Sequence, residues 1–338
     1  MGAIDINTKI YFQNRDHFAD LFNFKLYDGR QQIHAADLKP VDSAVVIAPY
    51  GNHARQPIQR IRDNVSMWAS MQDDHSAYII LGIESQTNIH YAMPVRNMVY
   101  DSSNYAEQIQ RASASYSDKK KERNEQFKLS NSEFLSGFRK EDRLIPVITI
   151  VLLFNADTWD GPRSIHEMLS IHDAGLLKYI PDYRINLVAP AELQENEYRK
   201  FHTPLGQVIE YIRVSRDKDK LDQLMKKDSR YSRMDRDSAN LINAVTNSKL
   251  TYPEEGDEID MCKAIDDMRA DAKAEGIEEG RAEGRAVGIE EGRAEGKTES
   301  LVSSIKNVMD SIHVSIEEAM DILKVDPQKR QEYAARVK

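Results

Sequence analysis

Two short, strongly apolar runs constrain the fold of this chain most: residues 77–84 (AYIILGIE) and residues 144–154 (LIPVITIVLLF). Both are short and rich in β-branched residues, which is typical of strands buried on both faces of a sheet. Between them, the polar residues 94–128 contain no glycine and no proline after Pro94, and a proline suits the first turn of a helix. We therefore expect a strand, a long helix and a second strand around a central sheet.

The pattern of apolar residues extends this arrangement on both sides. Residues 15–24 carry apolar side chains at helical spacing, and residues 60–68 predict a strand that forms a hairpin with residues 77–84. Residues 185–188 predict a further strand, and every segment from residue 205 onward has a helical pattern. This order of elements indicates an α/β or mixed α+β fold with a central sheet.

The chain contains one clear internal repeat, GIEEGRAEGRAV at residues 276–287 and GIEEGRAEGKTE at residues 288–299. Glycines recur every four residues, so on a helix they form one stripe. Each glycine costs roughly 1 kcal/mol relative to alanine inside a helix, and close contact with a partner helix would offset that cost. The alternative is a flexible, low-complexity tether between two folded parts.

The formal net charge is −9, and all of it comes from residues 254–300, because acids and bases are equal in number over the rest of the chain. The acidic balance therefore does not exclude nucleic acid as a partner. Residues 111–143 and residues 213–236 are basic on balance. Such stretches either bind phosphates by releasing counterions or are solvated helix faces.

Several classes of protein are excluded by what the sequence lacks. The longest mainly apolar run, residues 144–154, is shorter than the about 20 residues that a membrane-spanning helix needs. The first residues, MGAIDINTK, lack a basic head followed by an apolar stretch, so we expect no secretory signal. The single cysteine, Cys262, cannot form an internal disulfide or a thiolate metal cluster. We expect a cytoplasmic protein with no membrane partner. The chain also lacks the GxxxxGK[ST] phosphate loop and the GxSxG nucleophile motif.

Acidic residues at the expected hairpin carry the best candidate chemistry. Asp63 lies near the start of the first expected strand and Glu84 at the end of the second, and these positions are neighbours in an antiparallel pair. Gln86, two residues after Glu84, faces the same side of the sheet. Two carboxylates with a polar neighbour suit Mg²⁺, which polarises a phosphodiester and activates water. The alternative is that these acids are caps, turn residues or surface groups.

Several motifs, in order along the chain, resemble one family. They are RDHFADLFNFKLYDGRQQI, RIRDNV, YIILGIESQTNIHYAMPVRNMVYDSSNYAEQI, PVITIVLLFNADTWDGPRSIHEML and YIPDYRINLVAP, followed by the Glu/Gly-rich repeat and a small helical end. Together they resemble the Rpn family of recombination-promoting nucleases, often labelled putative transposases, within the PD-(D/E)XK superfamily. The resemblance implies a restriction-endonuclease-like core with a central mixed sheet flanked by helices, an all-helical C-terminal extension, and DNA cleavage that depends on Mg²⁺ or Mn²⁺.

The order of segments along the chain suggests how it is divided, and the resemblance suggests what it does. We expect the nuclease-like core in residues 10–216, a helical segment in 217–252, the acidic Gly-repeat helix or tether in 253–300, and a small helical segment in 301–338. The expected function is that of a metal-dependent DNA endonuclease linked to recombination, mobile elements or defence. The alternative is a catalytically weak or inactive nuclease-like protein that binds DNA or partners and oligomerises through its C-terminal helices.

The resemblance also assigns roles to single residues. Asp63, preceded here by Arg62 rather than Pro, matches the acid of the PD motif, and Glu84 matches the acid of the (D/E)XK motif. Both would be metal ligands. Gln86 stands where the superfamily usually has Lys, although related nucleases often carry Gln there. A neutral amide cannot supply the positive charge with which a Lys stabilises developing negative charge, so the site would need a cation from another element, and Arg96 is the nearest along the chain.

Two further residues are expected near this site. Asp20, on the first expected helix, would match the optional first acid of the superfamily and act as a further metal ligand. Gln108, about one helical turn from Tyr105 in the NYAEQI segment, would face the same site.

Overall fold

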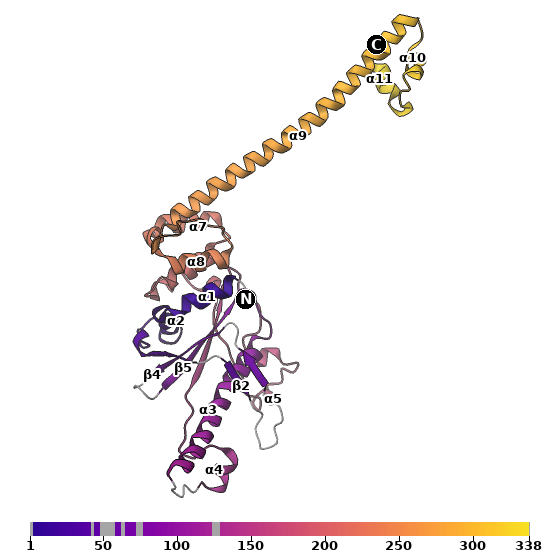
Figure 1. Cartoon of the computed structure of the whole chain (residues 1–338). Coiled ribbons are helices and arrows are strands. Elements are labelled where there is room, and N and C mark those ends of the chain that lie inside the picture. Colours follow the sequence, from indigo (N-terminus) through magenta and orange to yellow (C-terminus); the bar gives the residue numbers. More distant parts are fainter. Residues whose placement is uncertain are drawn as a thin grey trace. The chain divides into compact units, whose positions relative to one another are not determined.

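The computed structural model describes residues 3–41, 44–47, 58–61, 65–71, 77–123 and 129–337. The chain forms two compact units, Met1–Ile265 and Asp266–Lys338, and both are drawn in Figure 1. In the described part of the chain, no helix is both long and apolar enough to cross a membrane.

Helices make up most of the described chain. They are α1 (Ala3–Gln13), α2 (Arg15–Tyr27), α3 (Met93–Arg123), α4 (Asn131–Ser136), α5 (Ala174–Leu177), α6 (Leu205–Val214), α7 (Lys218–Lys227), α8 (Arg236–Thr246), α9 (Met261–Ile312), α10 (Ile316–Ile322) and α11 (Arg330–Val337). The strands are β1 (Leu38–Pro40), β2 (Ala44–Ile47), β3 (Ile58–Ile61), β4 (Val65–Met71), β5 (Ala77–Gln86), β6 (Val147–Leu153), β7 (Asn186–Val188), β8 (Met234–Asp235) and β9 (Glu258–Ile259).

A five-stranded mixed sheet in the order β1-β4-β5-β6-β7 forms the centre of the first unit. The strands β1, β4 and β5 are antiparallel neighbours, whereas β6 runs parallel to β5 and β7 parallel to β6. The parallel pairing of β5 and β6 requires a crossover, and the long helix α3 provides it. The expected strand–helix–strand unit and the mixed α/β class are therefore confirmed.

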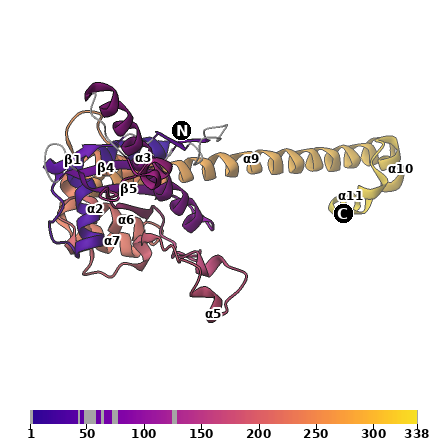
Figure 2. The same ribbon diagram turned by 90° about the horizontal axis from the view of Figure 1, so that it is seen from below.

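Helices cover both faces of this sheet. Side chains of β5 and β6 alternate between the faces, so Glu84 and its register partner Val151 lie on one face and Ile83 and Ile150 on the other. Met93 of α3 belongs to the cluster that contains Val151, so α3 covers the first face. Figure 2 shows α3 on one side of the strands and α2, α6 and α7 on the other.

Helix α2 is anchored beneath the second face by aromatic and polar contacts. The ring of Phe18 lies 6.1 Å from that of Trp68 on β4. The fully buried side chain of Asn23 donates to the carbonyl oxygen of Ile33 at 2.8 Å and accepts from the backbone N–H groups of Gln32 and Ile33 at 3.0 and 2.8 Å. The side chain of Asn23 thus joins α2 to the loop that follows it, because it both donates to and accepts from the backbone of that loop.

The structure corrects the expected strand at residues 60–68. Residues of this range belong to two strands, because β3 ends at Ile61 and pairs with β2, whereas β4 begins at Val65 and pairs with β1 and β5. Apolar periodicity over a few residues cannot show that the chain changes sheets. Helix α1 was also not predicted from the sequence; it packs on α8, where Ser238 donates a hydrogen bond to the hydroxyl of Tyr11.

The second unit has its own small core. Ile305 of α9 packs with Ala319 and Met320 of α10 and with Tyr333 of α11. Ser315 caps α10 by accepting from the backbone N–H of Glu318, whose side chain accepts in return from the backbone of Ser315. This capping box was predicted from the sequence, and it is confirmed. The glycine repeat is helical throughout and lies within α9.

The turn after α2 offers a test of local strain. Gly29 has a φ of +85°, and a Cβ added there would lie 2.7 Å from the carbonyl oxygen of Lys200. Gly256 has a φ of +100° but no atom within 4 Å of such a Cβ. We expect Gly256→Ala to cost about 1–2 kcal/mol through backbone strain alone, and Gly29→Ala to cost about 1–3 kcal/mol more because of the added clash. Urea denaturation measures both, and equal losses would contradict the contact with Lys200.

Candidate functional site

The candidate site lies at the end of β5, beneath the first turns of α3. Glu84 faces α3 and has no solvent-exposed surface. Its Oε1 accepts a hydrogen bond from Nε2 of Gln86 at 2.9 Å and forms an ion pair with Nη2 of Arg96 at 2.9 Å. The structure therefore brings together three of the residues that the sequence singled out.

The start of α3 positions Arg96. Met93 is fully buried in a cluster with Val151 and Leu153 of β6, so the first turn of the helix is fixed on the sheet. The guanidinium of Arg96 also lies over the ring of Tyr100, 5.6 Å from its centroid. An arginine held against an aromatic face in this way loses little further freedom when it binds a carboxylate.

The ion pair compensates the buried negative charge of Glu84. A buried carboxylate costs several kcal/mol unless a cation and hydrogen-bond donors compensate for its lost hydration. Glu84 obtains a cation from Arg96 and a neutral donor from Gln86. Its side chain is completely buried, whereas that of Arg96 is 27% exposed, so the pair extends from the core to the surface.

Asn97 is a polar residue at this site that sequence reasoning missed. Its side chain is fully buried, and neither amide atom has a hydrogen-bond partner among the described residues. It lies one helical turn from Met93, which packs on Val151, and one turn from Asp101, which accepts a hydrogen bond from Thr149. Asn97 therefore faces β6 close to Val151, the register partner of Glu84. One signal in the sequence could have found it. Met93, Asn97 and Asp101 are four residues apart, so they lie on the same face of the helix.

Gln108 lies elsewhere on the same helix. Its amide donates to the carbonyl oxygen of Ile145 at 3.0 Å and accepts from the backbone N–H of that residue at 2.7 Å. Ile145 is six residues before Val151, which pairs with Glu84, and six residues of strand span roughly 20 Å. Gln108 thus holds the entry to β6 and is not brought to Glu84.

Asp20 is buried, and both of its carboxylate oxygens accept hydrogen bonds from residues 202 and 203. Its two oxygens accept from the backbone N–H of His202 at 3.0 Å, and Oδ2 accepts from the N–H and the hydroxyl of Thr203 at 2.8 and 2.7 Å. These contacts tie α2 to the segment that leads into α6. Asp20 therefore has a structural role, and nothing in the described contacts links it to Glu84.

Asp63 lies outside the described residues, so the geometry of the site is described without it. The register places Val65 of β4 opposite Glu84. Within the described ranges, no group of three or more His, Cys, Asp or Glu residues is arranged to hold a metal ion. The described part of the site supplies one buried carboxylate, the amides of Gln86 and Asn97, and one guanidinium, and a divalent cation would need a second acid.

Comparison with known proteins adds no relative: no family model matches the chain, and neither a curated protein nor a solved structure is significantly similar to it.

The ion pair beneath α3 can be tested against a second pair on the same helix. Arg96→Gln leaves the buried Glu84 carboxylate without its cation, so we expect the free energy of unfolding to fall by at least about 2 kcal/mol. Arg111 pairs with Glu107 on the surface and is 68% exposed, so Arg111→Gln should cost less than about 0.5 kcal/mol. Chemical denaturation of both variants measures the difference. Similar losses would mean that Glu84 does not depend on Arg96.

Proposed function

We propose that this chain is a metal-dependent DNA endonuclease of the PD-(D/E)XK type. The observation that carries the proposal is the buried Glu84 carboxylate at the end of β5, with Gln86 and Arg96 in direct contact with it. Glu84 and Gln86 lie on a mixed sheet in which β4 and β5 are antiparallel and β6 returns parallel through α3, the helix that carries Arg96. A sheet and helix crossover of this kind is what the sequence resemblance implies for the core of such nucleases.

Arg96 supports the proposal because it supplies the positive charge that Gln86 lacks. Its guanidinium contacts Glu84 Oε1 at 2.9 Å, the same atom to which Gln86 donates. We infer that Gln86 orients the Glu84 carboxylate and that Arg96 stabilises negative charge that develops on a bound phosphodiester. Arg96 is partly exposed and lies at the beginning of a helix, so it is accessible from solvent.

A metal ion is the remaining component of the proposed site. Glu84 would bind Mg²⁺ or Mn²⁺ together with Asp63, because the described residues supply only one carboxylate there. Such an ion supplies polarisation of the phosphodiester and activation of the attacking water. The DNA backbone would contact basic side chains, for which the stretches 111–143 and 213–236 are candidates. The expected biological setting is recombination, the movement of mobile elements or defence.

The nuclease proposal is tested by incubating supercoiled plasmid with the full-length chain and Mg²⁺ or Mn²⁺. We expect nicking by the parent protein and a loss of at least about 100-fold in Asp63→Asn and Glu84→Gln, because each removes a charged group from the reacting centre. Glu107→Gln, which changes a partly exposed acid on α3 that pairs with Arg111, is the matched control and should cleave normally. Equal nicking by all four proteins would assign the activity to another source.

A second candidate function, assembly through α9, is favoured by the environment of its glycine stripe. The six glycines at 276, 280, 284, 288, 292 and 296 lie in a continuous helix, and no described atom beyond the neighbouring residues and the local helix backbone lies within 4 Å of a Cβ added at any of them. They therefore pack against nothing described within their own chain. Close approach of the same helix from a second copy would use this surface and would make the chain a homo-oligomer.

Alanine substitution distinguishes a packed stripe from an isolated helix. In an isolated helix, Gly284→Ala and Gly288→Ala together should increase helicity, because alanine is favoured by about 1 kcal/mol per site. If the stripe packs against a second copy, the two added methyl groups separate the backbones, and we expect the oligomer to dissociate while helicity is retained. Sedimentation velocity and circular dichroism measure both properties. Unchanged sedimentation would show that the glycines do not form the contact.

A further inference from the structure

A charged cavity of about 160 Å³ lies in the first unit, in the helical layer opposite α3. Its walls come from the segment around the 3₁₀ turn Tyr198–Lys200, from α6, from α7 and from the turn Ser229–Arg233. At roughly 30 Å³ per water molecule, the cavity holds about five waters. It is therefore large enough for a small metabolite.

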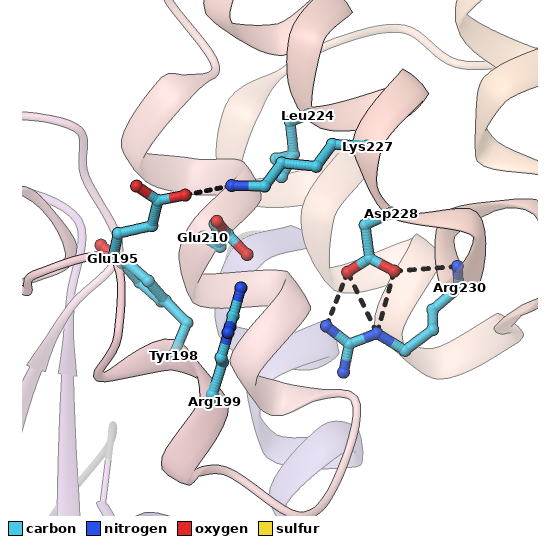
Figure 3. Close-up of a pocket in the computed structure, with 8 residues that line it drawn as sticks. All are labelled: Glu195, Tyr198, Arg199, Glu210, Leu224, Lys227, Asp228 and Arg230. Atoms are coloured by element: carbon cyan, nitrogen blue, oxygen red, sulfur yellow. Dashed lines mark hydrogen bonds and ion pairs between the residues drawn. The ribbon is translucent and has the colours of Figure 1, made fainter.

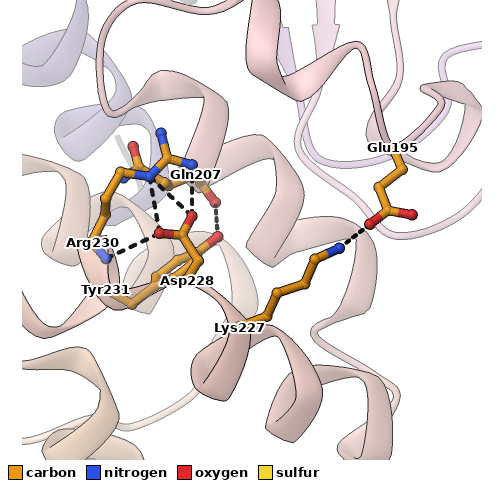
Figure 4. A network of polar contacts seen from close by, with 6 residues as sticks. All are labelled: Glu195, Gln207, Lys227, Asp228, Arg230 and Tyr231. Carbon is orange, nitrogen blue, oxygen red and sulfur yellow. Dashed lines mark hydrogen bonds and ion pairs between the residues drawn. The ribbon is translucent and has the colours of Figure 1, made fainter.

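Two ion pairs flank the cavity. Lys227 pairs with Glu195 on one side. On the other side Asp228 accepts from Nε of Arg230 at 2.9 Å and pairs with its Nη2 at 2.6 Å. Figure 4 shows both pairs, together with the hydrogen bond from the Tyr231 hydroxyl that anchors the turn on α6. These contacts keep the four charged groups at the walls.

Two further charged groups lie between the pairs and have no such partner. No hydrogen bond or ion pair joins Glu210 or Arg199 to another residue in the described part of the chain. Figure 3 shows both side chains between the Lys227–Glu195 and Asp228–Arg230 pairs. Burial raises the pKa of the Glu210 carboxyl, although nearby Arg213 opposes the shift. The fold thus retains a half-buried acid that nothing in the cavity compensates by direct contact.

The charge pattern of the cavity identifies the class of ligand. Its lining contains three acids and three bases, so it does not favour a net anion such as phosphate. The described acids form no cluster that could hold a metal ion. A small zwitterion satisfies both unpaired groups, because its ammonium donates to Glu210 and its carboxylate accepts from Arg199. The remaining wall is apolar, formed by Leu224 and the ring of Tyr198, whose hydroxyl donates away to the carbonyl oxygen of Pro190.

We propose that this cavity binds a free α-amino acid with an apolar side chain. Glu210 holds the ammonium group, Arg199 holds the carboxylate, and Leu224 and Tyr198 contact the side chain. The site is independent of the proposed nuclease centre, because Glu84 lies on the α3 face of the sheet and the cavity lies in the opposite layer.

The test uses the full-length chain and L-leucine as the probe, measured by isothermal titration calorimetry. We expect a dissociation constant of about 1 mM or tighter. The matched controls are 4-methylpentanoate, which lacks the ammonium, and 3-methylbutylamine, which lacks the carboxylate. Each should bind at least about tenfold more weakly, because it leaves one charged group of the cavity unpaired. No heat with leucine, or equal binding of either analogue, would overturn the proposal.

Substitutions of Glu210 and Arg199 test the two proposed contacts separately. Glu210→Gln and Arg199→Gln should each weaken leucine binding by at least about tenfold, whereas Lys226→Gln removes a nearby exposed charge that does not line the cavity and should leave it unchanged. Glu210→Gln should not lower the melting temperature at neutral pH, because the raised pKa means that the fold disfavours the charged carboxylate. Arg199 is exposed, so we expect Arg199→Gln to fold as the parent protein does. Unchanged leucine affinity in both variants would exclude this cavity as the site.

Discussion

The packing of α3 against β5 and β6 is the constraint on which the first unit depends. The parallel pairing of these strands requires a crossover, and α3 both provides the crossover and covers the face of the sheet that it leaves. That face contains Glu84, so the helix must bring a cation to a buried acid as well as apolar side chains to the core. Arg96 does so from the first turn of α3, next to the position where Met93 fixes the helix on β6.

The sheet also separates two polar regions that have different physical characters. On the α3 face, Glu84 is fully buried and its contacts are short, so its charge is balanced within the core. In the opposite helical layer, Glu210 is half-buried among several charges and has no direct partner in the described chain. A compensated buried charge contributes to a fixed geometry, whereas an uncompensated one costs stability unless a proton, water or a ligand satisfies it.

Long and strongly patterned segments were predictable, and short ones that depend on packing were not. The strands β5 and β6 and the helix α3 followed from apolar runs and from the positions of proline and glycine. Helix α1 was missed because its adjacent buried residues Tyr11 and Phe12 reach the core only once α2 and α8 are packed around them. At the candidate site, the common face of Glu84 and Gln86 followed from the two-residue period of a strand. The contact with Arg96 depended on how α3 turns back over the sheet.

The sequence by itself determined the mixed α/β class, the central strands and the long crossover helix, because these depend on local periodicity and composition. It also indicated the mainly helical character of the chain after residue 205, although β8 and β9 form a short antiparallel pair there that the expected all-helical extension did not include. Tertiary structure alone decided the partners of the polar groups. Glu84 and Arg96 are twelve positions apart, Asp20 and Thr203 are 183 positions apart, and Glu210 meets its neighbours across several helices. No local pattern encodes such pairings, because they follow from how helices and strands pack once the apolar faces are buried.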